Sequence, residues 1–304
     1  MPDPVVSIII PVFERAAEAN ALLQQLDGQT FGSFEALIVD DGSWPPVAER
    51  TTISGHLYPI RIVRHERQGG IARARNTGIQ NSSADLLLFL DSDCILTDAQ
   101  WLQKHIQAQE DSEEPSVIHG KVIGIHSTYA GHADGYSNWF LSCQSKSYIA
   151  RNHHLPANNS SVPRAVFEKI GLFDEACRVA EDVEWSFRCL AQGVPLLYRP
   201  EMAVGHHDRE SWRALWRHYY RFGEYALVVR KRLPRSPFEF LFPNGRIAAI
   251  IYLLPLAGLM TAYIVVQWLR TEWRVLYYIP GLLFANIAYG AGILHYCIHR
   301  ECPD

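Results

Sequence analysis

The segment Leu86-Leu87-Leu88-Phe89-Leu90-Asp91-Ser92-Asp93 joins a run of apolar residues to a pair of aspartates. Its unbroken apolar run predicts a buried strand over residues 85–90, and the strand ends in two aspartates that one residue separates. In an open α/β sheet, ligands bind beyond the carboxyl ends of the strands. This stretch therefore predicts a sheet and a binding site at the edge of that sheet.

The residues around this stretch alternate between strand and helix patterns. Apolar, β-branched runs predict strands, and helical spacing of apolar residues predicts the connecting helices. Such alternation implies a mostly parallel sheet covered by helices, and so an α/β fold. The predicted strands cover residues 5–12, 35–39, 60–65 and two short segments within 195–204; the predicted helices cover 14–27, 70–80, 163–170, 182–190 and 211–233.

Two more predicted strands end in polar residues. The first ends at Phe13-Glu14, and the second ends in Asp40-Asp41-Gly42-Ser43. A carboxylate such as that of Asp41 can accept hydrogen bonds from a base or a ribose. The alternative is a simple strand-ending turn, since Asp and Gly favour turns. Because three strands end in chemically capable residues, we favour a binding site.

Asp91 and Asp93 have the spacing of a cation site. Mg²⁺ and Mn²⁺ prefer oxygen ligands and are often held by one or two carboxylates plus substrate phosphates. His206, which follows the last predicted strand, could add an imidazole ligand. The alternatives are a solvated turn for the aspartates and a structural role for the histidine.

The pair Glu181-Asp182 begins a predicted helix. Acidic side chains at a helix N-terminus complement its dipole, and this alone accounts for Glu181. For Asp182 we favour a second role, that of a general base, because a carboxylate can take the proton of an attacking hydroxyl.

Two uncharged runs, residues 247–269 and 275–298, are each long enough to cross a bilayer. The alternative is a pair of buried core helices. Cations cluster before the first run and should stay in the cytoplasm; they are Arg230, Lys231, Arg232, Arg235 and Arg246. We therefore predict a multi-pass inner-membrane protein with three parts: a cytoplasmic catalytic domain (1–210), an interfacial helix and linker (211–246) and a hairpin that spans the membrane (247–298).

The composition excludes several classes. The formal net charge is -4, which argues against nucleic-acid binding. The six cysteines form no CxxC pair, so we expect free thiols in a reducing compartment. The N-terminus lacks the pattern of a cleaved signal peptide. Strand one is followed neither by GxGxxG nor by another Gly-rich loop, which argues against a nicotinamide dehydrogenase and a sugar nucleotidyltransferase.

Taken together, the motifs resemble those of the family 2 glycosyltransferases. The resemblance covers roughly residues 5 to 225, and it implies the GT-A fold and inverting transfer from a nucleoside diphosphate sugar. The segments that carry it are Ile8-Ile9-Ile10-Pro11-Val12-Phe13, Val39-Asp40-Asp41-Gly42-Ser43, Ala74-Arg75-Asn76-Thr77-Gly78, Leu90-Asp91-Ser92-Asp93, Gly171-Leu172-Phe173-Asp174-Glu175 and Glu181-Asp182.

The resemblance also implies residue roles. Asp93 would hold the Mn²⁺ or Mg²⁺ with His206 as a second ligand, and Asp182 would be the catalytic base. Asp41 would contact the nucleobase, and Asp91 would lie near the ribose. The donor side would further include Phe13, Glu14, Gly70, Arg73 and Ser92, and the acceptor and diphosphate side would include Glu181, Trp185 and Arg221.

Two departures from the family pattern matter. The first motif usually continues Pro-x-Tyr-Asn, but here it reads Pro11-Val12-Phe13-Glu14, which adds a negative charge beside the expected donor. Processive members carry Gln-x-x-Arg-Trp, and the nearest match is His218-Tyr219-Tyr220-Arg221-Phe222. We therefore expect transfer of a single sugar, from a UDP-linked donor, to a lipid-linked or glycan acceptor at the membrane. The alternatives are a polyprenyl-phosphate glycosyltransferase and a non-catalytic membrane scaffold that binds sugar nucleotides.

Overall fold

The computed structural model describes residues 4–230, 233, 243 and 245–299. They form two compact units. The first comprises residues 1–122 and 146–206, and the second comprises 123–145 and 207–304. Residues 123–145, which the sequence places inside the catalytic domain, thus group with the C-terminal helices. Lys231, Arg232, Arg235 and most of the predicted link before Pro243 lie outside the described residues.

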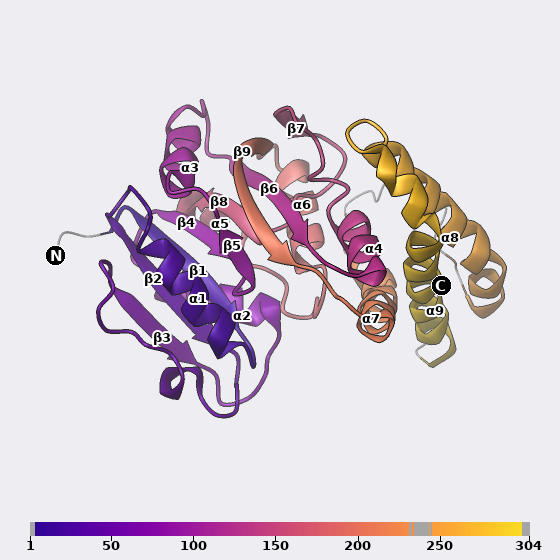
Figure 1. Cartoon of the computed structure of the whole chain (residues 1–304), viewed down its shortest axis with the longest axis horizontal. Helices are drawn as coiled ribbons and strands as arrows, with labels where there is room; N and C mark the ends of the chain where they lie inside the picture. Colours follow the sequence, from indigo (N-terminus) through magenta and orange to yellow (C-terminus); the bar gives the residue numbers. More distant parts are fainter. Residues whose placement is uncertain (1–3, 231–232, 234–242, 244, 300–304) are drawn as a thin grey trace. The chain divides into compact units, whose positions relative to one another are not determined.

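Half of the sheet is parallel, as the sequence predicts (Figure 1). β1 (Val6–Val12) pairs in parallel with both β2 (Phe34–Asp40) and β4 (Leu86–Leu90), and β3 (Ile60–Arg64) pairs in parallel with β2. β1 and β2 are buried along their whole length, because helices cover both of their faces. The carboxyl ends of these strands therefore meet at one edge.

The other half of the sheet is antiparallel, so the sheet is mixed rather than mostly parallel. Here the order continues from β4 through β8, β6 and β9 to β5, and β7 pairs with β9. The prediction of two short strands within 195–204 is wrong: β9 is one continuous strand that spans Pro200. Pro200 lies between the residues that pair with β7, which end at Tyr198, and those that pair with β5, which begin at Val204. The strands are β5 (Cys94–Leu96), β6 (Val117–Ile125), β7 (Tyr148–Ala150), β8 (Asn159–Pro163) and β9 (Leu196–His207).

Helices of the first unit pack on this sheet through apolar faces. In α1 the buried residues recur at helical spacing, from Ala16 to Leu26. α1 begins two residues later than predicted, because Glu14 has a φ of 57° that no helix can include. A core of aromatic rings from Phe89, Phe167 and Trp185 anchors α5 and α6. The elements are α1 (Ala16–Leu26), η1 (Val47–Glu49), α2 (Ile71–Asn81), α3 (Trp101–Glu110), α5 (Arg164–Ile170) and α6 (Glu181–Ala191).

The second unit is helical. It contains α4 (Tyr129–Asn138), α7 (Trp212–Arg230), α8 (Arg246–Trp268), η3 (Trp273–Tyr278) and α9 (Ile279–His299). Among the described residues, two segments are long and apolar enough to cross a membrane: α8, with a mean hydropathy of 2.2, and the 27 residues of η3 and α9 together, with a mean hydropathy of 1.4.

Candidate active site

An acidic cluster with one histidine lies at the end of β4. Asp91 and Asp93 occupy the turn between β4 and β5. β5 pairs antiparallel with the end of β9, so that Cys94 lies opposite His206. This register brings His206 Nε2 to 3.3 Å from Asp93 Oδ1. One ligand atom from each of Asp91, Asp93 and His206 lies within 4.8 Å of the others.

These three residues fit a divalent cation. Two carboxylates and one imidazole are a donor set that Mn²⁺ accepts readily, and Mg²⁺ accepts the carboxylates. Burial raises the pKa of Asp93, but a hydrogen bond and charge from His206 and the charge of Arg15 outweigh it and hold the pKa well below its usual range. Asp93 is therefore an anion, as a metal ligand must be. A bound cation would supply positive charge for substrate phosphates.

Arg75 connects the metal cluster to α6. Its side chain is buried; Nη2 donates to Asp91 Oδ1 at 2.9 Å, and Nη1 donates to Glu181. Arg75 stands in one of the motifs that carry the family resemblance, but the sequence predicts no role for it. The sequence held one signal for such a role: Arg75 is a charged residue between Ala74 and Asn76 in a predicted helix. All three residues are buried in α2, and a charge on a buried helix face requires partners.

Asn76, the next residue of that motif, fixes the loop before α6. Its amide nitrogen donates to Phe173 O at 2.9 Å and to Glu175 Oε1 at 3.0 Å, and its oxygen accepts from Phe173 N. The motifs at 74–78 and 171–175 are far apart in the sequence, and these hydrogen bonds join them in the structure.

The two carboxylates at the start of α6 differ. Glu181 is buried; burial raises its pKa, and Arg75 lowers it by less. Asp182 is half-buried and accepts from its neighbour Val183 N at 2.9 Å and from Ala157 N at 3.3 Å. Asp182 is therefore the more accessible carboxylate of the pair. Its role as base stays a prediction.

The carboxylates at the end of β2 are surrounded by donors. Asp41 accepts from Gly69 N at 2.9 Å and Gly70 N at 2.8 Å, and His65 Nδ1 lies 2.7 Å from its Oδ1. Gly70 has a φ of 98°, which a glycine adopts without strain. Asp41 thus shapes the loop that starts α2. Its contact with a nucleobase stays a prediction.

The remaining donor-side residues are distributed around this edge. Glu14 joins the loops after β1 and β2, since its Oε1 accepts from Trp44 N at 2.8 Å and its N–H donates to Ser43 Oγ at 3.0 Å. Its extra negative charge therefore faces a backbone donor. Phe13 is 39% exposed, Arg73 packs against Gly69, and Ser92 is buried in the turn between the aspartates.

The two other residues that the resemblance puts on the acceptor and diphosphate side have different surroundings. Trp185 is only 3% exposed and donates its indole N–H to Gly171 O at 2.9 Å. It lies in the aromatic core, so its surroundings indicate packing rather than acceptor contact. Arg221 is exposed on α7 in the second unit.

A family model described as glycosyl transferase family 2 matches residues 7–170, more than half of the chain. The chain is a family 2 glycosyltransferase. It is 29% identical over 229 residues to glycosyltransferase AglE of Haloferax volcanii, covering 74% of each chain. It is also 30% identical over 193 residues to an uncharacterized glycosyltransferase of Haemophilus influenzae, covering 61% of this chain and 62% of that one.

Solved structures confirm the GT-A fold of this glycosyltransferase. The mannosyltransferase PcManGT of Pyrobaculum calidifontis, in complex with GDP-Man and Mn²⁺, matches 93% of this chain and 86% of its own with a TM-score of 0.61. S. aureus TarS 1-349 in complex with UDP-GlcNAc matches 94% and 90% with a TM-score of 0.57. Both are 14% identical to this chain, so the likeness concerns the fold.

Proposed function

We propose that this glycosyltransferase transfers a single sugar, with inversion, from a nucleoside diphosphate sugar to a lipid-linked acceptor at a membrane. The observation that carries the proposal is the cluster of Asp91, Asp93 and His206 at the carboxyl edge of the sheet. A divalent cation held there would neutralise charge on the departing diphosphate. We favour a uridine diphosphate donor and a site on the cytoplasmic side.

Asp182 is the proposed base. Because Arg75 binds both Asp91 and Glu181, it ties the first residue of α6 to the metal cluster. Asp182 is the next residue, and its side chain is accessible. An acceptor hydroxyl that attacks the anomeric carbon could give its proton to this carboxylate. A polyprenyl phosphate is the alternative acceptor, and being ionised it needs no base.

Activity on donors is the direct test. Purified full-length protein in vesicles of native lipids would receive UDP- and GDP-sugars, each with Mn²⁺ and with a chelator. We expect metal-dependent release of nucleoside diphosphate and a lipid whose mass increases by one sugar. Metal-dependent donor binding without any release would instead support a non-catalytic scaffold.

Asp182→Asn separates the two acceptor classes. With a hydroxyl acceptor, turnover should fall by about 100-fold or more, because general base catalysis is lost while donor affinity is kept. With a polyprenyl phosphate the loss should be smaller and reflect positioning alone. Single-turnover rates and the melting temperature are measured on one preparation. Unchanged turnover of a less stable protein would remove Asp182 from the mechanism.

A further inference from the structure

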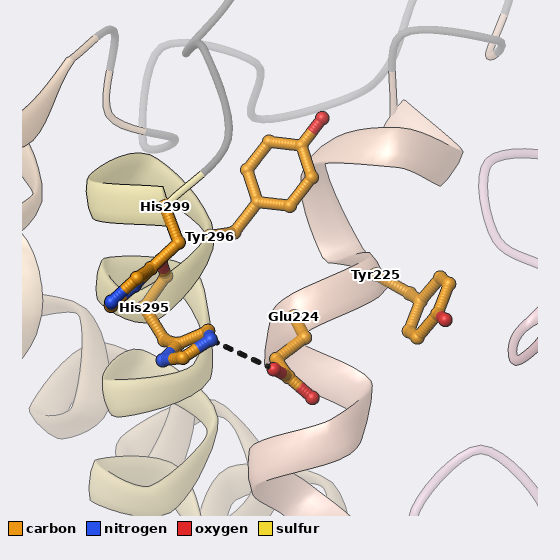
Figure 2. A pocket seen from close by; sticks show the side chains of 5 residues that line it. All are labelled: Glu224, Tyr225, His295, Tyr296 and His299. Atoms are coloured by element: carbon orange, nitrogen blue, oxygen red, sulfur yellow. Dashed lines mark hydrogen bonds and ion pairs between the residues drawn. The ribbon is translucent and has the colours of Figure 1, made fainter.

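The helices of the second unit have an arrangement that bears on how the protein meets a membrane. α7 and α9 lie side by side and run in the same direction. Trp212 packs on Phe284 near one end, with ring centroids 5.0 Å apart, and Glu224 Oε1 lies 3.4 Å from His295 Nε2 towards the other. Figure 2 shows Glu224 and His295 facing each other, in a small pocket that Tyr225, Tyr296 and His299 also line.

The contact between these two helices is close. A Cβ on Gly223 would meet the carbonyl of Tyr289, and one on Gly292 would meet the carbonyl of Tyr220. The glycines therefore permit a backbone approach that any larger residue would prevent. Over this length, α7 and α9 must enter or avoid a bilayer together.

α8 packs against α9 in the opposite direction. Arg246 Nε donates to Cys297 O at 3.2 Å at one end of the pair, and Asn286 Nδ2 donates to Thr261 Oγ1 at 3.0 Å within it. α9 thus contacts both α7 and α8, and the residues of α9 that face them are buried. The connection between α8 and α9 lies at the end of the bundle near Trp212.

That connection is held by α4. Tyr129 Oη donates to Tyr277 O at 2.8 Å, Trp268 Nε1 donates to Tyr136 O at 2.8 Å, and the ring of Tyr278 stacks on His132. Only His126, Ser127 and Thr128 join β6 to α4. Extended residues span at most about 3.5 Å each, so this link cannot cross a hydrocarbon core of about 30 Å. The α8–α9 connection is therefore on the same side of a membrane as β6.

A spanning hairpin does not fit this arrangement. If α8 and α9 crossed from that side, α7 would have to cross beside α9. α7 carries Arg213, Arg217 and Arg221 on one exposed face, and it also carries Glu224. Charges of this kind inside a bilayer are costly and rare. The charged face of α7 requires water along its whole length.

α8 has the opposite surface. No charged residue occurs between Ile247 and Leu269, and large aliphatic side chains are exposed along one face, with Ile247 76%, Ile251 63% and Leu254 65% exposed. Its 23 residues make a helix about 34 Å long. Arg246 precedes the face, and Arg270, Arg274 and Trp273 follow it, the last being 71% exposed. Cations and amphipathic rings around an apolar face match anionic headgroups around acyl chains.

We infer that the second unit is monotopic: the outer face of α8 lies in one leaflet of an anionic bilayer, α7 faces water, and neither α8 nor α9 crosses the membrane. This replaces the spanning hairpin predicted from hydropathy, and it does not depend on the identity of the donor or the acceptor. The occupant of the α8 face is lipid, because the cations and rings around its apolar side chains match anionic headgroups around acyl chains.

Cysteine labelling tests the topology on the full-length protein. The five described cysteines are buried, so a Cys302→Ser background suits single additions at exposed positions. Thr271→Cys in the connection and Arg217→Cys on α7 should both react with an impermeant maleimide from the side that carries the catalytic unit. Leu254→Cys should react only after detergent is added. Reaction of Thr271→Cys solely from the other side would overturn the inference.

Vesicle binding tests the occupant. Detergent-purified protein would be mixed with vesicles of phosphatidylcholine and phosphatidylglycerol and floated on a gradient. Ile251→Ser with Leu254→Ser should reduce the bound fraction by at least about tenfold, since it removes apolar groups from the lipid. Arg217→Ser on α7, the control, should not. If the double variant instead converted a dimer to a monomer and left vesicle binding unchanged, the face would be a protein interface and the inference would fail.

Discussion

Two strands of this protein end in acidic residues, but the two ends use them differently. At the end of β2, backbone amides are the main partners of the carboxylates: Asp40 accepts from Ser43 N and Val47 N, and Asp41 accepts from Gly69 N and Gly70 N. Side chains add one contact to each, from Arg64 to Asp40 at 3.5 Å and from His65 to Asp41 at 2.7 Å. At the end of β4 the partners are side chains, because Arg75 binds Asp91, while Arg15 and His206 bind Asp93.

The difference shows what a strand-end carboxylate can do. A backbone amide is fixed by the fold, so a carboxylate that accepts several amides holds the loop in shape. An arginine or histidine side chain can rotate away, so carboxylates paired in this way remain available to a cation. The β2 end therefore shapes the loops around the site, and the β4 end offers carboxylates that could hold a cation.

The largest expected effect comes from Arg75→Met, which removes the cation between Asp91 and Glu181. Breaking a buried ion pair by deleting one partner typically costs about 3–5 kcal/mol. Burial raises the pKa of Glu181 to about 8 even with Arg75 present, and the variant should raise it further. A raised carboxyl pKa lowers stability progressively as pH rises above the unfolded value of about 4.5.

Denaturant unfolding of Arg75→Met between pH 5 and about 9 measures this loss. The deficit relative to the parent protein should grow above pH about 8, where Glu181 ionises in the parent protein but stays protonated in the variant, and Glu181→Gln added to Arg75→Met should remove most of that growth. A deficit that is the same at every pH would show that Glu181 is not the group that depends on Arg75.

Asp93→Ala should weaken cation binding and leave the protein folded. The Mn²⁺ dependence of donor binding should disappear and turnover should fall by more than about 100-fold, since even the partners of metal ligands are typically worth 10–100-fold. Calorimetry of nucleoside diphosphate with Mn²⁺ provides the measurement. Asp98→Ala, at an aspartate that pairs with Lys104, is the matched control and should leave both quantities unchanged. Metal-dependent affinity that survives in Asp93→Ala would place the cation elsewhere.

Sequence reasoning predicted the parallel half of the sheet because its signals are local. β1, β2 and β4 are apolar runs followed by polar turns, and such runs are readable one strand at a time. The antiparallel half was predicted less well, because β5 has only three residues and because Pro200 within β9 indicates a break between two strands. Pairing between them, which brings His206 to Asp93, depends on contacts that no single segment encodes.

The site shows the same limit. Asp91, Asp93 and His206 could be proposed from residue type and the family resemblance, and the structure brings them together. The role of Arg75 could not, since its partners lie 16 and 106 residues away in the chain. The resemblance implied that Trp185 lies on the acceptor side, but helical geometry turns position 185 into the core. In the same way, hydropathy predicted the apolar helices α8 and α9, but it could not predict that the charged helix α7 packs against α9.

The smallest expected effect is at the β2 end, and it tests the comparison most directly. Asp40 is 1% exposed and is not a predicted donor contact. Asp40→Asn keeps one acceptor oxygen but turns an NH₂ group towards Ser43 N or Val47 N, which leaves buried donors unsatisfied. Each such group costs about 1–3 kcal/mol, so the melting temperature should fall while the Mn²⁺ dependence of the folded protein stays normal.

Asp41→Asn completes the test, because Asp41 is both a loop acceptor and the predicted nucleobase contact. If it only shapes the loop before α2, Asp41→Asn should match Asp40→Asn: a similar stability loss and an unchanged preference between UDP and GDP. If it also contacts the base, nucleotide affinity should fall in addition, by an amount that differs between the two nucleotides. Competition binding of UDP and GDP distinguishes these results. A loss of Mn²⁺ binding in either variant would instead show that the two strand ends share one function, and the contrast between amide-held and side-chain-held carboxylates would not stand.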